Sequence, residues 1–241
     1  MFDVVIVDEA QDVLKEPYLD VLDVSLRGGL AAGTWRFFSD YTKQSIYGTD
    51  CIPLDEFLEK RASAAAIYTL TTNCRNTPRI ASYVSLLGGL RPPYARVLRA
   101  DDGIEPDLRF FASEEEQHEL LCDVLEALRG EGYRGQDTVV LSPKGSSACA
   151  SQVQTLPWRD RLRQLGTEKA GHIGYTSIHA FKGMEAAAVV VTDVESLKGE
   201  AAQNLFYVAI TRATDRLIVL VSESARAKAT EIVLAGPGGT S

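Results

Sequence analysis

The sequence Val4-Val5-Ile6-Val7-Asp8-Glu9-Ala10-Gln11-Asp12 decides the fold of this chain. Its run of β-branched residues predicts a strand that is buried on both faces of a parallel sheet. Asp8 and Glu9 follow at the carboxyl end of that strand, where open α/β sheets place their chemistry. In this position Asp8 is suited to hold Mg²⁺, and Glu9 is suited to polarise a water molecule.

Strand-like and helix-like segments alternate outward from this stretch. Further strands are expected at residues 35–38, 68–70, 108–111, 138–142, 186–192 and 217–221. Helical patterns are expected at residues 16–27, 54–66, 77–87 and 113–128. This alternation predicts an α/β fold with a parallel sheet flanked by helices. A break near residues 60–68 separates an opening piece from a fuller α/β unit, and the tail at 226–241, which includes a Gly-Pro-Gly-Gly run, is expected to be disordered.

Composition places the chain among ordinary globular proteins, with 45% hydrophobic and 24% charged residues in 241. No apolar stretch is long enough to span a bilayer and no signal peptide opens the chain, so we expect a cytoplasmic protein without a membrane partner. The four cysteines are far apart and are expected to be reduced thiols, and the three histidines do not indicate a zinc site.

The net charge of −8 argues against a protein that coats nucleic acid by bulk electrostatics. A narrow strand-binding groove remains compatible with it. Local basic clusters occur at Arg91, Arg96 and Arg99 and again at residues 159–163, and solvated surface faces are the plainer interpretation of both.

Gly28 and Gly33 have the spacing of a phosphate-binding loop, but they are not followed by the residues of one. Thr34-Trp35 stands where that loop needs Lys followed by Ser or Thr, and a strand follows instead of a helix. The segment is therefore interpreted as a turn.

Polar strings follow several of the expected strands. The order along the chain is Phe37-Phe38-Ser39-Asp40 with Gln44-Ser45-Ile46-Tyr47, then Leu70-Thr71-Thr72-Asn73-Cys74-Arg75-Asn76, then Thr176-Ser177-Ile178-His179-Ala180-Phe181-Lys182-Gly183-Met184-Glu185, then Phe206-Tyr207-Val208-Ala209-Ile210-Thr211-Arg212-Ala213. Gln44 could sense a γ-phosphate or its attacking water, and Arg75 and Arg212 supply positive charge.

In this order the strings resemble motifs II to VI of the UvrD/Rep-type superfamily 1 DNA helicases, as far as about residue 222. The resemblance implies two RecA-like domains of the P-loop NTPase type, with ATP and Mg²⁺ as cofactors and single-stranded DNA or a duplex junction as partner. It implies an ATP hydrolase whose domain closure on ATP is coupled to movement on DNA. Arginines supplied by that closure can contribute about 10³–10⁵ in rate.

The resemblance also implies a role for each matching residue. Asp8 and Glu9 match the Mg²⁺ carboxylate and the catalytic base, and Gln44 matches the phosphate-sensing glutamine. Arg75 and Arg212 match the arginines that reach the γ-phosphate. The remaining assignments are Glu185 to the ribose hydroxyls, Gly183 and Asp40 to nucleotide binding, and Thr176, His179, Lys182 and Tyr47 to single-stranded DNA.

Plainer interpretations stand beside some of these roles. Asp40 could be only a cap, and Tyr47 could be core packing. His179 could simply bond to the backbone, and Lys182 could be a surface charge.

The chain departs from the family pattern in four ways. It has no Walker A loop before Asp8, so triphosphate affinity is expected to collapse without one. Cys74 stands where the family has a tyrosine that stacks on adenine, and a thiol cannot replace that ring. The spacing from Asp40 to Gln44 is one residue longer than in many members. Only about 100 residues separate the Arg75 and Thr176 motifs, so the large accessory insertion of UvrD-type enzymes is missing or vestigial.

Residues 1–60 therefore resemble the trailing part of a first RecA-like motor domain, and residues 67–225 resemble a complete second one. The leading hypothesis is the C-terminal motor portion of an ATP-dependent DNA helicase or translocase, inactive on its own and completed by a Walker A domain in cis or in trans. The alternative is a non-enzymatic helicase-like module that binds nucleic acid or a partner. A metal-dependent nuclease using Asp8, Glu9 and Asp12 is disfavoured, because the sequence offers no clear further set of carboxylates with a lysine.

Overall fold

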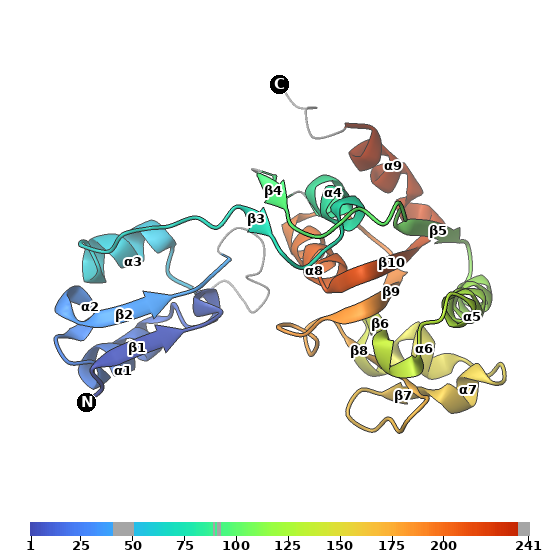
Figure 1. The fold of residues 1–241 in the computed structure, drawn as a ribbon, viewed down its shortest axis with the longest axis horizontal. Helices are drawn as coiled ribbons and strands as arrows, with labels where there is room; N and C mark the ends of the chain where they lie inside the picture. The colour runs from blue at the N-terminus through green and yellow to red at the C-terminus, as the bar shows by residue number, and fades with distance from the viewer. Residues whose placement is uncertain (41–50, 89, 91–92, 236–241) are drawn as a thin grey trace. The chain divides into compact units, whose positions relative to one another are not determined.

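The structure is a computed structural model that describes residues 1–40, 51–88, 90 and 93–235 (Figure 1). The chain divides into two compact units, Met1–Leu70 and Thr71–Ser241. The division falls just after the expected break at 60–68. The assignment of these units to two motor domains stays a prediction.

The smaller unit is built around strands β1 (Val4–Val7) and β2 (Thr34–Phe37), which pair in parallel. The connection contains η1 (Ala10–Asp12), α1 (Glu16–Ser25) and the one-turn helix α2 (Gly29–Ala32), and α3 (Leu54–Arg61) follows β2. Gly28 adopts a positive φ of 84° directly before α2, and Gly33 follows α2. Gly28 and Gly33 therefore belong to a local turn that leads into β2.

The core of the smaller unit lies on one face of this sheet. The rings of Trp35, Phe37 and Phe57 are in mutual contact, with centroids 4.6 to 5.9 Å apart. Leu14, Leu19 and Leu26 are among the residues buried in the same cluster. The opposite face is open, since Val4 is 52% and Ile6 is 67% exposed. The prediction that the Val4–Val7 run is buried on both faces is therefore wrong, because the described residues cover only one face.

The larger unit contains a six-stranded sheet of order β5-β10-β9-β6-β8-β7, in which every neighbouring pair is parallel. Its strands are β5 (Asp107–Phe111), β6 (Thr138–Ser142), β7 (Leu162–Gln164), β8 (Ile173–Ser177), β9 (Ala186–Val194) and β10 (Ala213–Ser222). A small parallel pair, β3 (Thr72–Asn73) with β4 (Arg96–Val97), precedes it. The predicted fold class, α/β with a parallel sheet flanked by helices, is confirmed.

Helices cover both faces of the six-stranded sheet (Figure 1). Helices α5 (Glu114–Gly130), α6 (Cys149–Gln152) and α7 (Trp158–Arg161) bury one face together with alternate strand residues such as Val140, Val190 and Ile218. Helices α4 (Pro78–Leu87) and α8 (Glu200–Ile210) contact β10 from the other side. The larger unit also contains the short 3-10 turns η2 (Gly135–Asp137), η3 (Gly145–Ser147) and η4 (Glu223–Ala225).

Two helix starts follow from their local sequence. Pro78 occupies the first turn of α4, where its missing N–H costs nothing, although the side chain of Thr77 before it makes no capping hydrogen bond. Ser113 caps α5, and its Oγ accepts a hydrogen bond from the Glu116 N–H at 3.2 Å.

The chain end differs from expectation. Residues 226–241 were expected to be a disordered tail, but Arg226–Ala235 forms helix α9, which contacts α4. The Arg226 guanidinium lies 3.8 Å from the Phe110 ring centroid. This cation–π contact helps to hold the start of α9 against β5.

A buried carboxylate joins the carboxyl end of the sheet to the helices on one side. Asp193 is 3% exposed and adopts a positive φ of 60° near the end of β9. Its carboxylate accepts hydrogen bonds from Ser142 Oγ at 2.6 Å, the Cys149 N–H at 3.1 Å and Gln117 Nε2 at 3.2 Å. The Asp193 N–H in turn donates to Gln117 Oε1 at 2.8 Å. One side chain thus ties β6, β9, α5 and α6 together.

The four cysteines have very different surroundings, and all are free thiols. Burial raises the pKa of the Cys149 thiol well above its usual range, with the nearby Asp193 charge adding to the effect, and burial also raises the pKa of Cys122. Cys74 is exposed and Cys51 is half-buried. Since the thiolate is the reactive form, reactivity should differ sharply along the chain.

We therefore expect iodoacetamide at pH 8 to modify Cys74 first in the folded protein. Cys122 and Cys149 should react at least about 100-fold more slowly than Cys74, because exposing a buried thiol requires an opening that costs several kcal/mol. Peptide mass spectrometry over a time course measures this, and Cys74→Ser is the control that should remove the fast phase. Fast modification of Cys149 without denaturant would contradict the described core.

Candidate functional site

The candidate residues of the smaller unit lie at the carboxyl ends of β1 and β2. Asp8 and Glu9 directly follow β1, and Glu9 adopts the left-handed region, with φ 51° and ψ 43°. This conformation is uncommon for a residue other than glycine and indicates a constrained turn. The Asp8 Oδ1 atom accepts a hydrogen bond from the Glu9 N–H at 2.9 Å. The expected position of both carboxylates at the sheet edge is confirmed.

Gln11 organises this turn, and the sequence did not single it out. The residue is 2% exposed, and its Oε1 accepts hydrogen bonds from Ser39 Oγ at 2.6 Å and from the Asp40 N–H at 3.3 Å. Its Nε2 donates to the Glu9 carboxylate. Gln11 therefore links the base candidate Glu9 to Ser39 and Asp40, just beyond the end of β2. Its place inside the Asp8–Asp12 string was the available signal.

Two predicted residues of this part, Gln44 and Tyr47, lie outside the described residues. Within the described part of the chain, no group of three or more His, Cys, Asp and Glu side chains is arranged to hold a metal ion. The donor set nevertheless fits Mg²⁺, which proteins bind through one or two carboxylates together with phosphate oxygens and water. Asp8 is the residue that would hold it.

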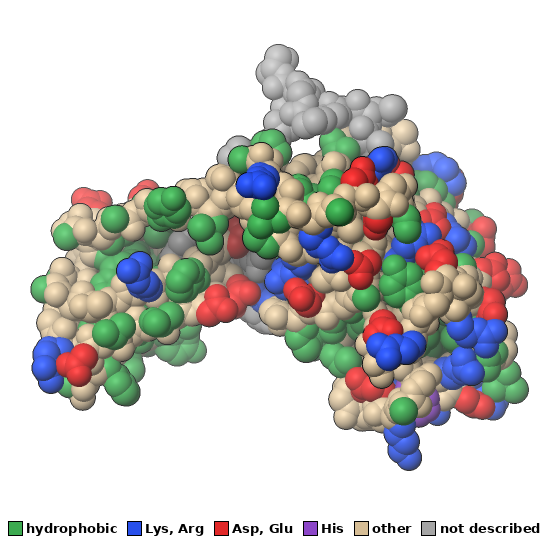
Figure 2. All heavy atoms as spheres, viewed as in Figure 1, with side chains coloured by type: hydrophobic (Ala, Val, Ile, Leu, Met, Phe, Trp, Pro, Cys, Tyr) green, Lys and Arg blue, Asp and Glu red, His purple; other side chains and the backbone are tan. Residues whose placement is uncertain are grey.

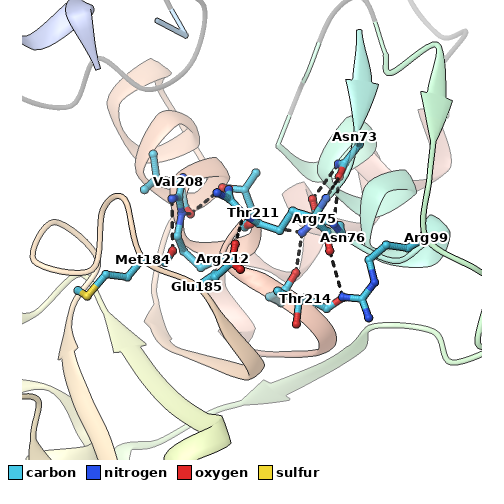
Figure 3. A network of polar contacts seen from close by, with 11 residues as sticks. Asn73, Arg75, Asn76, Arg99, Met184, Glu185, Val208, Thr211, Arg212 and Thr214 are labelled. Carbon is cyan, nitrogen blue, oxygen red and sulfur yellow. Dashed lines mark hydrogen bonds and ion pairs between the residues drawn. The ribbon is translucent and has the colours of Figure 1, made fainter. Parts of the chain in front are cut away.

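Three candidate residues of the larger unit meet at the amino ends of β9 and β10 (Figure 3). Glu185 immediately precedes β9, and Arg212 immediately precedes β10. Arg75 follows β3, and its Nε lies 2.7 Å from the Glu185 Oε2 atom. The side chains of Arg75 and Glu185 are 37% and 57% exposed. Residues 110 positions apart in the sequence thus form one charged cluster.

Arg212 lies deeper than Arg75. The residue is 2% exposed, and its guanidinium donates to the carbonyl of Val208 at 3.0 Å through Nε and to that of Met184 at 3.4 Å. The Arg212 carbonyl accepts the Ala186 N–H at 3.1 Å. Arg212 therefore holds the backbone on both sides of Glu185. The structure brings Arg75, Glu185 and Arg212 together, whereas their predicted roles toward ATP stay predictions.

Residues 176–185 form the connection that carries the predicted DNA-contacting side chains. Thr176 lies in β8 and pairs with Leu141, which is level with Val191 on β9. Glu185 is six residues before Val191, so Thr176 is about 20 Å farther along the strand direction, at ~3.3 Å per residue. The predicted DNA group and the predicted nucleotide group are thus at different levels of one sheet.

Buried apolar side chains hold this connection in place. Ile178 is 2% and Phe181 is 4% exposed, and the Ile178 N–H donates to the Ser142 carbonyl at 3.0 Å. His179 follows Ile178 and Lys182 follows Phe181 in this connection, and the Lys182 N–H donates to the His179 carbonyl at 3.2 Å. Gly183 has a φ of 80° and open space beside it, so the chain can turn there toward Glu185.

Opposite charges alternate over the surface of the larger unit, as Figure 2 shows for the face in view. Arg99 pairs with Asp215, and Arg159 with Asp160 at 3.0 Å. Arg161 lies 5.8 Å from the Trp158 ring centroid. The basic clusters seen in the sequence are therefore largely engaged locally, and Arg91 lies outside the described residues.

Residues 172–220 match the family of UvrD-like helicase C-terminal domains. This range contains the connection at 176–185 and both Glu185 and Arg212. This segment of the chain is similar to the C-terminal domains of UvrD-like helicases. The expected resemblance to the UvrD/Rep-type helicases is confirmed.

Among solved structures, the chain is similar to the C-terminal domain of a possible DNA helicase from Lactobacillus plantarum WCFS1. The two share 18% sequence identity with a TM-score of 0.48, over 63% of this chain and 89% of that one. No curated protein matches the chain. Across the described part of the chain, no helix is both long and apolar enough to cross a membrane.

Proposed function

We propose that this chain is the C-terminal motor portion of an ATP-dependent helicase or translocase that moves on single-stranded DNA. The observation that carries the proposal is the cluster of Arg75, Glu185 and Arg212 at the amino ends of β9 and β10. Two of these residues lie inside the UvrD-like match. A charged cluster built from segments far apart in sequence, yet held by buried contacts, is suited to a ligand with both charges and hydroxyl groups.

The chemistry that these residues can do follows from their types. Phosphoryl transfer needs positioning and charge neutralisation around the transferred group more than it needs covalent help from the protein. Glu9 would accept the proton of the attacking water, with Gln44 orienting that water, and Arg75 and Arg212 would neutralise charge on the γ-phosphate. Bound Mg²⁺ would supply further neutralisation from Asp8.

Nucleotide binding would use the remaining candidates. A carboxylate accepts hydrogen bonds only, which suits Glu185 to the ribose hydroxyls. Its second oxygen can take this role while Oε2 stays with Arg75 at 2.7 Å. Gly183 would let the backbone turn close to the nucleotide, and Asp40 would support the phosphate side. Cys74 offers no ring, so adenine stacking at that position is not part of the proposal.

The DNA strand would contact Thr176, His179, Lys182 and Tyr47. The connection at 176–185 supports a coupling role, because it joins a DNA-contacting end to the nucleotide-contacting Glu185 through a short segment anchored by Ile178 and Phe181. A change in the position of Glu185 would therefore be transmitted to His179 and Thr176. This arrangement supports movement on DNA that depends on the nucleotide state.

A Walker A segment, in cis or in trans, is the proposed partner of the smaller unit. The exposure of Val4 and Ile6 supports it, because a parallel sheet normally has both faces covered. Such a segment would also bring the Lys and backbone N–H groups that bind the triphosphate.

The isolated chain is expected to show negligible ATPase activity, with or without single-stranded DNA. The same chain fused after the Walker A half of a UvrD-type motor domain should hydrolyse ATP with stimulation by single-stranded DNA, measured by phosphate release. A fusion with its Walker A lysine changed to alanine is the matched control. Salt-dependent DNA binding without any nucleotide effect in the active-site-intact fusion would instead favour a non-enzymatic module.

A further inference from the structure

A buried pair of asparagines lies next to Arg75 (Figure 3). Asn73 is 6% and Asn76 is 2% exposed. The Asn73 Oδ1 atom accepts hydrogen bonds from the Arg75 N–H at 2.9 Å and the Asn76 N–H at 3.0 Å. Asn73 Nδ2 donates to Asn76 Oδ1 at 2.8 Å. Asn73 thus fixes the turn that carries Arg75 and orients the side-chain amide of Asn76.

The amide of Asn76 reaches across to the segment that carries Arg212. Its Nδ2 donates to the Ala213 carbonyl at 2.6 Å and to the Thr211 carbonyl at 3.3 Å. These carbonyls belong to the residues on either side of Arg212. The buried side chain of Asn76 therefore fixes the backbone on both sides of Arg212. Asn76 is also the residue that follows Arg75 in the sequence.

The contacts around the two arginines form a closed ring. Arg75 pairs with Glu185, the Met184 carbonyl before Glu185 accepts from Arg212, and Asn76 joins the Arg212 segment back to Arg75. Arg99 makes a second bridge between the same segments, since its Nη1 donates to the carbonyls of Arg75 at 3.1 Å and Thr214 at 3.0 Å. The partly exposed pair of Arg75 and Glu185 is thus linked to the buried side chains of Asn76 and Arg212.

We propose that Asn76 is a positioning residue that holds Arg75 and Arg212 as one rigid unit, so that both arginines are presented to a triphosphate together. The proposal rests on the proposed function for its ligand, but the coupling itself is a property of the protein alone. Because a neutral amide donates to the two carbonyls, these two Asn76 contacts do not depend on pH or on the charge state of the arginines. A ligand that moves one arginine must move the other.

The test uses the full chain without nucleotide, so its outcome is independent of the proposed ATPase activity. Arginine side-chain Nε–Hε signals are recorded by ¹⁵N NMR and assigned with Arg→Lys variants. Asn76→Asp is nearly the same size and keeps the acceptor for Asn73, but it loses the donors to Thr211 and Ala213. We expect the Hε exchange rates of both Arg75 and Arg212 to rise about 10-fold in this variant.

Arg216 is the internal control, since its Nε is bonded to Glu131 at 3.0 Å elsewhere in the same unit. Its Hε exchange should change less than about twofold, because the loss is local to the ring. Val190→Ala, a core change in β9 with no polar contact, should not alter Arg75 and Arg212 relative to Arg216. Unchanged Arg75 or Arg212 signals in folded Asn76→Asp, or an equal rise at Arg216, would overturn the proposal.

Asn76→Ser is the second variant, because it removes the amide donors without placing a charge in the interior. The unmodified chain gives a readout that needs no folded variant. The backbone N–H groups of Asn76 and Arg212 should show the same opening free energy in native-state hydrogen exchange across a denaturant series. Distinct opening free energies for these two groups would show that the arginine segments move independently.

Discussion

Replacing Arg75 with alanine is expected to lower the kcat of the DNA-stimulated ATPase of the Walker A fusion by about 10³-fold. The guanidinium would no longer neutralise charge that develops on the transferred phosphoryl group. Arg75 suits this experiment because its side chain is 37% exposed and its partner Glu185 is 57% exposed, so the substitution should leave the fold intact. Single-turnover phosphate release measures the chemical step directly.

Arg216→Ala is the matched control for this prediction. Arg216 is also an arginine paired with a carboxylate, and its Nη2 lies 3.3 Å from Glu131, but it is not part of the Arg75 cluster. The control should change kcat less than about threefold. Arg75→Lys keeps the charge but loses the planar fork, so we expect an intermediate rate. A kcat for Arg75→Ala within about tenfold of the unmodified fusion would contradict the proposed role.

Replacing Arg212 tests the catalytic role less directly than replacing Arg75. Its buried guanidinium supports the carbonyls of Val208 and Met184, so Arg212→Ala would remove structural contacts together with the charge. Loss of activity in that variant is informative only after its folding has been checked. Persistent turnover by a folded Arg212→Ala fusion would count against the motor assignment.

Replacing Asp193 with alanine is expected to lower the free energy of unfolding of the larger unit by about 3–5 kcal/mol. The substitution leaves buried donors on Ser142, Gln117 and the Cys149 backbone without their acceptor. It also places a residue with a Cβ at φ 60° that lacks the local hydrogen bonding of aspartate. Both effects act in the same direction.

Two companion variants separate these effects. Asp193→Asn keeps an acceptor oxygen and tolerates the left-handed backbone, so it should cost least. Asp193→Gly removes the acceptor but accepts a positive φ, so it should be about 1 kcal/mol less destabilised than alanine. Equal stability of the alanine and asparagine variants would contradict the described network.

The tryptophans make this measurement specific to one unit. Trp35 lies in the smaller unit and Trp158 in the larger one. In a Trp35→Phe background, fluorescence during denaturant unfolding reports Trp158 alone. Trp158 lies in α7, is 4% exposed and packs in the core of the larger unit. The midpoint and slope then give the stability of the larger unit without a contribution from the smaller one.

The sequence predicted most where side-chain periodicity is strongest. The buried runs at Thr138–Ser142 and Ala186–Val194 were found as strands with bounds close to those observed, because continuous β-branched runs indicate central strands. Short strands were harder. Residues 68–70 were expected to begin a strand, whereas β3 is Thr72–Asn73, since a two-residue strand carries almost no pattern.

The charged members of the site were predictable, whereas their supports were not. Arg75, Glu185 and Arg212 stand in motif strings that identify them. The supporting roles of Gln11, Asn76 and Arg99 depend on partners 24 to 137 positions away, and no local pattern encodes such contacts. The Val4–Val7 run predicted burial on both faces, but Val4 and Ile6 are exposed. An apolar sequence shows that a strand can be buried, and it does not show that other residues cover it.

The order of strands in the larger sheet has a consequence for synthesis on the ribosome. Strand β5 emerges early, but its only described neighbour in the sheet is β10, the last strand to be made. At typical elongation rates of about 5–20 residues per second, β5 spends about 5–20 s without its pairing partner. The six-stranded sheet can therefore be completed only after β10, its last strand, has been synthesised.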